Sequence, residues 1–334
     1  MVSAVIFVAT SCVSPLTGFA FWETNLAYEG ESIYNYLQVK NLSDRTILST
    51  NVLFGVQSVT MKDKGLTGMY YDTALAAPAL ADNANSALIL GMGTGTYARQ
   101  LKQYYPKMNI TGVEIDQKIT DLAGEYFDEP ADIPVTTYDG RAWLAASHDK
   151  YDVIMVDAYQ DITIPFQMSS TEFFTMVREH LNPGGAMVVN MNMISDGQGS
   201  INEALSDTIA SVFGNGNTLT ADVPNTTNRE LFAKKPGSGS EENSMQQASK
   251  ALNLRETTYE RTGSEDLEWY MEEVASRFRK VNEPDSASTI LTDDKAPVEV
   301  LGMHAIDQII ADEAGPYRQI LKDEGFGGLL RAVQ

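Results

Sequence analysis

Residues 87–95 read Ala-Leu-Ile-Leu-Gly-Met-Gly-Thr-Gly and decide the fold class of the chain. The first four residues form a short apolar run, which is typical of a strand buried inside a sheet. The three glycines that follow let the backbone turn tightly and come close to a ligand. Since residues 94–105 predict a helix that stops before Pro106, the stretch indicates a strand, a glycine loop and a helix in succession.

The alternation of strands and helices extends on both sides of this stretch. Strands are predicted at 34–39, 46–48, 109–113, 133–137, 151–156, 186–190, 218–221 and 230–233, with helices at 66–82, 115–127, 171–181 and 201–213. Repeated strand–helix units of this kind predict an α/β fold with a mostly parallel, doubly wound sheet.

Changes in composition predict four regions. They are an apolar segment at 1–22, a small N-terminal β-hairpin unit at 30–65, the doubly wound domain at 66–235, and a linker with a C-terminal helical extension at 236–334. The linker is inferred from the Lys-Pro-Gly-Ser-Gly-Ser run that begins at Lys235. The helical extension is inferred from apolar residues at helical spacing over 265–281.

The apolar segment at 1–22 contains no charged side chain and is about long enough to span a bilayer. Pro15 and Gly18 interrupt it, and no Lys or Arg precedes it, as one would in a signal peptide. Two interpretations therefore stand: membrane association through this segment, or an apolar strand or helix packed on the domain.

Composition narrows the classes of function. The chain carries 24 Lys and Arg residues against 45 Asp and Glu residues, and its net charge of −21 disfavours a phosphate backbone, so we expect no nucleic acid partner. The same charge suits a small cationic substrate, although an acidic surface also explains it. Cys12 is the only cysteine, and the three histidines lie too far apart in sequence for a metal-ligand motif, so no metal is expected.

Acidic residues follow the next two strands after the glycine loop. Glu114 ends a strand about twenty residues beyond the loop, where a carboxylate can accept both ribose hydroxyls of an adenosine. Asp139 follows the third strand and is placed to meet an adenine amino group. The loop is G-x-G-x-G, so its third glycine comes one residue early for the dinucleotide fingerprint. We expect an S-adenosyl ligand, with a dinucleotide or no ligand as alternatives, held by Gly91, Gly93, Thr94, Gly95, Glu114, Asp139 and Gly140.

Asp157 directly follows the fully apolar strand predicted at 151–156. An Asp at the carboxyl end of a central strand projects into the ligand crevice of an open α/β sheet. The other explanation is a helix or turn cap, which Asp often provides. The position of Asp157 at the switch point of the sheet favours the functional role.

Together these motifs resemble the polyamine aminopropyltransferases, the spermidine synthase family, in the branch whose domain follows membrane helices. The resemblance runs from Ser32 to Lys235 and is carried by Ser32-Ile33-Tyr34-Asn35-Tyr36, Gln57-Ser58, Tyr70-Tyr71-Asp72, the glycine loop, Val113-Glu114-Ile115-Asp116, Asp139-Gly140-Arg141, Asp157, Ile164-Pro165 and Thr171-Glu172-Phe173-Phe174. Residues 292–299 resemble the closing segment of that branch, and we expect them to cap the fold, with closure over the site as the alternative. The resemblance implies a Rossmann-like sheet of the S-adenosylmethionine-dependent transferase type, a homodimer, and a cytoplasmic domain, membrane-anchored if residues 1–22 are a membrane-helix remnant.

The resemblance also implies an activity. In that family, decarboxylated S-adenosylmethionine donates an aminopropyl group to a diamine such as putrescine and leaves methylthioadenosine. Matched residue by residue, Glu114 binds the ribose, Asp139 contacts the adenine, and Asp157 is the catalytic residue that orients the amine and accepts its proton.

The amine site is implied with fewer matched residues. Gln57 and Tyr71 match donor-site or amine-site positions of the family. Asp161 is expected to hold the distal ammonium of the amine or to assist Asp157. Tyr159, together with Tyr71, is expected to line the path of the alkyl chain.

Two positions depart from the family pattern. The family has an Asp inside the glycine loop that holds the ammonium of the donor, and this chain has Thr94 there; its second Asp after the catalytic one is replaced by Gln160, with Asp161 following. A missing carboxylate weakens recognition of a cation, so ordinary S-adenosylmethionine is a second candidate donor. An S-adenosylmethionine-dependent methyltransferase and a non-catalytic domain that binds an adenosyl ligand stay open as alternatives.

Overall fold

A computed structural model describes residues 23–51, 56–63, 65–159, 164–192, 197, 199–237, 244–285, 288–304 and 322. Within these residues, one sheet has eight strands in the order β12-β10-β11-β9-β8-β5-β6-β7, and a second has four in the order β1-β2-β3-β4. The strands are β1 Leu26–Glu31, β2 Tyr36–Asn41, β3 Arg45–Thr50, β4 Ser58–Met61, β5 Ser86–Leu90, β6 Asn109–Glu114, β7 Val135–Thr137, β8 Tyr151–Val156, β9 Leu181–Asn192, β10 Thr218–Asp222, β11 Asn228–Lys234 and β12 Arg279–Lys280. The helices are α2 Tyr70–Ala74, α3 Ala76–Leu80, α4 Thr96–Tyr104, α5 Gln117–Tyr126, α6 Gly140–Ala146, α7 Thr171–His180, α8 Ile201–Phe213, α9 Ser244–Ala248, α10 Ala251–Thr262 and α11 Glu265–Arg277, with short 3₁₀ turns at Phe166–Met168 and Asn215–Asn217.

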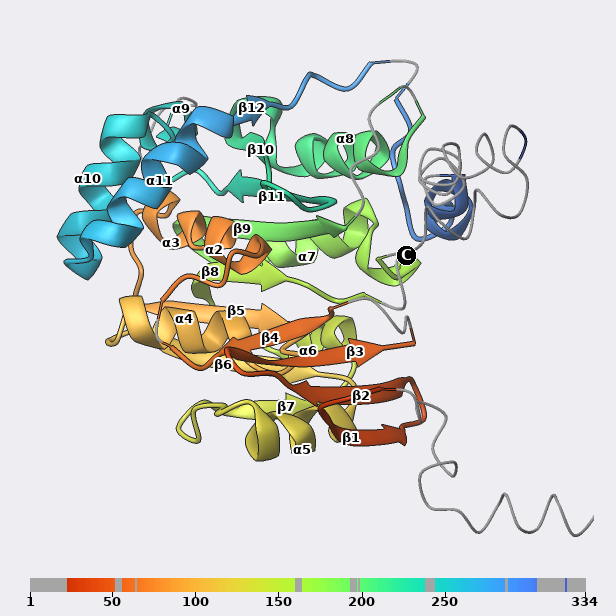
Figure 1. The fold of residues 1–334 in the computed structure, drawn as a ribbon. Coiled ribbons are helices and arrows are strands. Elements are labelled where there is room, and N and C mark those ends of the chain that lie inside the picture. The colour runs from red at the N-terminus through yellow and green to blue at the C-terminus, as the bar shows by residue number, and fades with distance from the viewer. Residues whose placement is uncertain are drawn as a thin grey trace, which may run out of the picture.

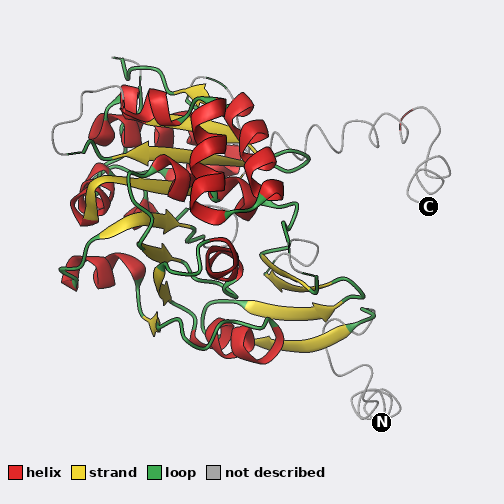
Figure 2. Ribbon diagram, turned by 90° about the vertical axis from the view of Figure 1, so that its left-hand side faces the viewer, coloured by secondary structure: helices red, strands yellow, loops and turns green. Residues whose placement is uncertain are grey.

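The centre of the larger sheet confirms the predicted α/β fold. Strands β9, β8, β5, β6 and β7 run parallel, while β10, β11 and β12 add antiparallel partners at one side, so the sheet is mixed. Every residue of β8 is buried, as expected for a strand that is covered on both faces. Helices α2, α3, α4, α10 and α11 supply the core on one face, and α6, α7 and α8 supply it on the other (Figures 1 and 2).

The predicted helix at 66–82 is wrong in its extent, because two short helices, α2 and α3, take its place. The carboxylate of Asp72 accepts hydrogen bonds from the backbone amides of Thr67 (2.8 Å) and Gly68 (2.6 Å). These bonds fold the residues before Tyr70 into a turn instead of a first helical turn. The side chain of Asp72 therefore overrides the helical pattern of its own segment.

The strand predicted at 186–190 is longer in the structure. Strand β9 already begins at Leu181, and its pairing with β8 shifts register between Tyr151 and Val153. The Asn-Pro-Gly-Gly run after α7 predicts a break between a helix and a strand. In the structure, this run forms the irregular first residues of β9. The sequence pattern does not predict helices α6 and α10.

The N-terminal unit is a four-stranded antiparallel sheet, larger than the predicted hairpin. Residues 32–35 form a turn between β1 and β2, so the strand expected from 34 begins only at Tyr36. Apolar residues of β2 and β3 pack against Ile119 and Leu122 of α5. This packing sets the small sheet beside β6 and α5 of the large one (Figure 1).

The C-terminal part packs on the large sheet at two places. Leu267, Met271 and Val274 of α11 join one core, and Leu291 and Val298 join the other. Among the described residues, no helix combines the length and the apolar character needed to cross a membrane. The apolar segment at 1–22 lies outside the described residues.

Candidate functional site

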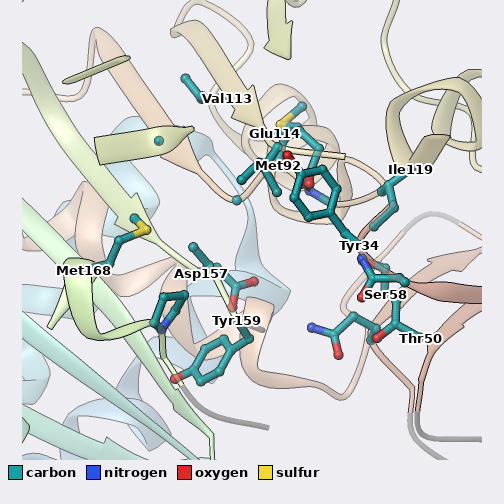
Figure 3. A pocket seen from close by; sticks show the side chains of 18 of the residues that line it. Tyr34, Thr50, Ser58, Met92, Val113, Glu114, Ile119, Asp157, Tyr159 and Met168 are labelled. Atoms are coloured by element: carbon teal, nitrogen blue, oxygen red, sulfur yellow. Dashed lines mark hydrogen bonds between the residues drawn. The ribbon is translucent and has the colours of Figure 1, made fainter. Parts of the chain in front are cut away.

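A cavity of about 290 Å³ opens at the carboxyl ends of β5, β6 and β8, between the two sheets (Figure 3). This is the edge of an open α/β sheet at which ligands bind. Residues far apart in sequence line it: Tyr34, Asn35, Leu48, Thr50, Gln57, Ser58, Tyr71, Gly91, Met92, Gly93, Val113, Glu114, Ile115, Ile119, Tyr138, Asp139, Gly140, Asp157, Ala158, Tyr159, Pro165, Gln167 and Met168. The structure thus brings together most of the residues that the sequence singled out.

The glycine loop forms the floor of the cavity between β5 and α4. Gly91 has φ of 88°, and a Cβ atom there would lie 2.3 Å from the carbonyl oxygen of Asp157, so a side chain does not fit. Gly91 and Gly93 line the cavity, whereas Thr94 and Gly95 do not. Thr94 is fully buried, and its hydroxyl has no hydrogen-bond partner.

Glu114 ends β6 and is bound to the glycine loop. Its carboxylate accepts hydrogen bonds from the backbone amides of Gly93 (2.8 Å) and Asp116 (3.0 Å). Burial raises the pKa of Glu114, and these backbone bonds partly offset the rise. A loop amide that would face a phosphate in a dinucleotide site is therefore already occupied by a carboxyl group.

Asp139 and Gly140 line the wall at the beginning of α6. One carboxylate oxygen of Asp139 accepts a hydrogen bond from the backbone amide of Ala142 (2.8 Å) and caps the helix. Asp139 therefore has a structural task in addition to its place in the cavity.

Asp157 follows β8 and continues its pairing, since its backbone amide donates to the carbonyl of Leu90 (2.9 Å). The hydroxyl of Tyr70 donates to Oδ2 (2.6 Å), and Nδ2 of Asn190 donates to Oδ1 (2.9 Å). Burial raises the pKa of Asp157 to about 7, although both hydrogen bonds lower it, and nearby Glu114 adds to the rise. Asp157 can therefore gain or lose a proton near neutral pH.

Tyr70 and Asn190 are functional candidates that the sequence reasoning missed. Asn190 ends the strand predicted next to that of Asp157, and it is itself held by Nδ2 of Asn228, which donates to its Oδ1 (2.9 Å). Tyr70 directly precedes the candidate Tyr71. A polar residue at the end of the neighbouring strand was the available signal for Asn190. The Tyr70-Tyr71-Asp72 motif was the available signal for Tyr70, but only Tyr71 was assigned a role from it.

Tyr71 joins the two sheets at the cavity. Its hydroxyl donates to the backbone carbonyl of Gln57 (3.1 Å) and lies 3.4 Å from the hydroxyl of Ser58. Its ring lies 4.0 Å from that of Tyr70, centroid to centroid. Burial raises the pKa of Tyr71, so it remains a neutral hydroxyl at physiological pH.

Tyr159 lines the cavity two residues beyond Asp157. Its hydroxyl donates to the backbone carbonyl of Asn190 and accepts from the amide of Asn192 (2.9 Å). Asp161 lies outside the described residues, as does Gln160. Within the part of the chain that is described, no cluster of His, Cys, Asp and Glu could hold a metal ion.

Comparisons with known proteins point to one family. The model of the spermine/spermidine synthase domain matches residues 69–235. A probable polyamine aminopropyl transferase of Bifidobacterium longum (strain NCC 2705) is 99% identical over 334 residues, which are 100% of this chain and 75% of that protein. The chain therefore spans three quarters of the length of that relative.

Two solved structures share the fold. A probable spermidine synthase from Corynebacterium glutamicum aligns over 80% of this chain and 99% of its own, with a TM-score of 0.56 and 21% identity. A spermidine synthase in complex with the transition-state analogue AdoDATO aligns over 64% of this chain and 75% of its own, with a TM-score of 0.53 and 19% identity. At these identities the likeness supports the fold alone.

Proposed function

Because this chain belongs to the spermine/spermidine synthase family, we propose that its pocket binds decarboxylated S-adenosylmethionine and a small diamine such as putrescine. Membership of that family, with the near-identical relative, makes the protein a transferase that moves an aminopropyl group. The observation that carries the proposal is the carboxyl group of Asp157, with a pKa of about 7, at the end of a cavity that also contains Glu114.

The chemistry explains why such a carboxyl group is needed. The bond between the sulfonium sulfur and the propyl carbon breaks, its electron pair leaves with sulfur, and the neutral thioether methylthioadenosine needs no acid to depart. The new bond joins that carbon to the amine nitrogen, which must give up a proton. An amine with a pKa near that of lysine pays about 4–5 kcal/mol to present a free lone pair at pH 7.

Asp157 is the proposed acceptor of that proton. Its carboxylate would attract the ammonium, orient the nitrogen and take the proton directly or through water. Tyr70 and Asn190 hold both of its oxygens in place, so the carboxylate is oriented before the amine arrives. Gln57 and Tyr71 are proposed to contact the amine.

The donor fits the acidic groups at the strand ends. Glu114 is proposed to accept the ribose hydroxyls, and Asp139 the adenine amino group. A dinucleotide is disfavoured because the third glycine of the loop comes one residue early for the dinucleotide fingerprint. These assignments carry the family's roles onto matching residues of this chain.

A methyltransferase is the second candidate, and Thr94 is the observation that favours it. Thr94 stands where the family has an Asp, so the loop offers no carboxylate to the ammonium of a decarboxylated donor. The hydroxyl of Thr94 is itself buried and does not line the cavity. The experiment is to incubate the protein with putrescine and either S-adenosylmethionine or its decarboxylated form. Methylthioadenosine supports aminopropyl transfer, adenosylhomocysteine supports methyl transfer, and ligand binding without either product supports a non-catalytic domain.

Asp157→Asn tests the residue itself. We expect the variant to keep its affinity for methylthioadenosine in calorimetry and to lose at least about tenfold in turnover, because an amide cannot accept the proton. Asp149→Asn changes an exposed carboxylate elsewhere and is the matched control. Full turnover of Asp157→Asn would remove Asp157 from the mechanism.

The homodimer and the membrane attachment through residues 1–22 remain predictions from the family resemblance. Light scattering of the purified protein tests the first. Flotation with lipid vesicles, comparing the chain with and without residues 1–22, tests the second.

A further inference from the structure

Arg141 connects three segments that are far apart in the sequence. It stands in α6, directly after Asp139 and Gly140 of the cavity wall. Its Nη1 donates to the backbone carbonyl of Gln167 (2.7 Å) and to Oδ1 of Asp293 (2.7 Å), and its Nη2 donates to Oδ2 of Asp293 (2.6 Å). One guanidinium thus joins α6, the loop after β8 and the C-terminal segment.

The C-terminal segment is anchored at the same place by further bonds. Asp293 accepts a hydrogen bond from the hydroxyl of Ser170 (2.5 Å), and its backbone amide donates to Glu172 (3.1 Å). The amide of Thr171 donates to the carbonyl of Leu291 (2.9 Å), and the side chain of Leu291 is fully buried. All these bonds reach the N-terminal end of α7, where the loop that lines the cavity ends.

The two parts that Arg141 connects form one wall of the cavity. Pro165, Gln167 and Met168 line it from the loop, and Asp139 and Gly140 line it from the beginning of α6. The parts lie close together, because a Cβ atom added to Gly140 would lie 3.6 Å from the methyl group of Met168. A displacement of the loop would therefore change the shape of the cavity beside Asp139.

We propose that Arg141 and Asp293 are positioning residues that hold the nucleoside-side wall of the pocket. Through them the C-terminal segment, which lies beyond the matched domain at 69–235, sets the affinity for the adenosyl ligand. The proposal rests on the proposed function in one respect: it assumes that the adenosine of the ligand binds against this wall.

The pair is suited to positioning more than to stability. A bidentate pair of a guanidinium and a carboxylate fixes distance and plane, and each group moves the pKa of the other toward the charged form. The Asp293 side chain is 40% exposed, however, and exposed ion pairs add little to the free energy of unfolding. Loss of this ion pair should leave the protein folded and should change the shape of the pocket.

Asp293→Ala is the main test. We expect the dissociation constant of methylthioadenosine, measured by calorimetry, and the KM for the donor to rise about fivefold, a change of the size that one hydrogen bond of ordinary net strength contributes. The KM for the diamine and kcat should stay within about twofold of wild type, since Asp157 is untouched. Arg141→Lys retains the charge but not the fork, and an intermediate effect is expected.

Asp132→Ala is the control, because Asp132 forms an equally short, more exposed pair with Lys102 (2.6 Å), and neither residue lines the cavity. Amide hydrogen exchange over 164–168 adds a readout that needs no ligand, and it should accelerate in Asp293→Ala but not in the control. Unchanged exchange and affinity in a folded Asp293→Ala would overturn the positioning role alone. A wild-type protein that bound no adenosyl ligand would overturn both this inference and the proposed function.

Discussion

Asp157 shows how much the chemistry of one residue depends on its surroundings. An aspartate in water has a pKa of about 3.9, whereas burial raises the pKa of Asp157 to about 7. Tyr70 and Asn190 donate to its two oxygens and limit that rise. A substantial fraction of Asp157 is therefore ionised at neutral pH and can bind an ammonium group. The raised pKa also makes its carboxylate a better acceptor for the proton of that group.

The pH profile of the reaction should report Asp157. The carboxylate accepts a proton only when ionised, so kcat/KM for the diamine should rise with pH through an apparent pKa of about 7. Tyr70→Phe removes a bond that lowers this pKa, and the midpoint should move to higher pH. Steady-state rates between pH 5 and 9 provide the measurement. A midpoint that stays in place in Tyr70→Phe would argue against this assignment.

Glu230 should make stability depend on pH. It is fully buried in β11, neither carboxylate oxygen has a hydrogen-bond partner, and burial raises its pKa well above the ordinary value. Because the folded state holds this proton more tightly, stability is complete below the unfolded pKa of about 4.3 and falls as pH rises, by up to about 1.4 kcal/mol per pH unit.

Glu230→Gln should remove the contribution of Glu230 to that slope. Urea unfolding at several values between pH 5 and 8 is the measurement. The advantage of the variant over wild type should grow with pH. Parallel curves would show that Glu230 is ionised in the folded state.

At the scale of elements, strand β5, the glycine loop and helix α4 act as one unit. The loop needs left-handed backbone at Gly91, Gly93 and Gly95, with φ of 88°, 55° and 78°. A non-glycine residue is strained there. At Gly91 the close approach of the Asp157 backbone adds a steric limit, so the loop also fixes where β8 ends.

Gly91→Ala should abolish binding of methylthioadenosine and lower the melting temperature, because the new methyl group would meet backbone atoms of Asp157 and Ala158. Gly124→Ala is the control. Gly124 is exposed in α5, a methyl group added there would have no neighbour within 4 Å, and the variant should gain about 0.5–1 kcal/mol from helix propensity. Calorimetry and thermal melts separate the two, and normal ligand affinity in Gly91→Ala would contradict the steric argument.

At the scale of the whole molecule, the N-terminal unit lines part of the pocket, and the C-terminal segment is bonded to Arg141 behind one of its walls. The hydroxyl of Ser32 (2.5 Å) and Nδ2 of Asn35 (3.1 Å) donate to Asp116, two residues beyond Glu114. These bonds hold the turn that carries Tyr34 over the cavity (Figure 3). The small sheet thus contributes directly to the site.

Ser32→Ala should loosen that turn. We expect a rise of about fivefold in the dissociation constant of methylthioadenosine, a change of the size of one ordinary hydrogen bond. Hydrogen exchange over 32–36 should become faster, because the Ser32 hydroxyl also accepts from the amides of Tyr34 and Asn35. Ser200→Ala, which removes the cap of α8 elsewhere, is the control. Equal affinities in the two variants would show that the turn does not act on the site.

The sequence by itself determined the order of strands and helices from 86 to 213 apart from α6, together with the glycine loop and the acidic residues at the strand ends. Apolar runs, glycines and chain breakers act on their immediate neighbours, so these features can be recognised in the sequence without knowledge of the fold. It also indicated Asp157, because the end of a buried parallel strand has a known place in this type of sheet.

Only the tertiary structure decided the environment of those residues. Tyr70 lies 87 positions from Asp157, and Asp293 lies 152 positions from Arg141, so no local sequence pattern predicts either contact. The pKa of Asp157, the turn at Asp72 and the place of Tyr34 in the pocket all depend on which segments fold together. Burial and hydrogen bonding are properties of the packed chain, and they become defined only when distant segments meet.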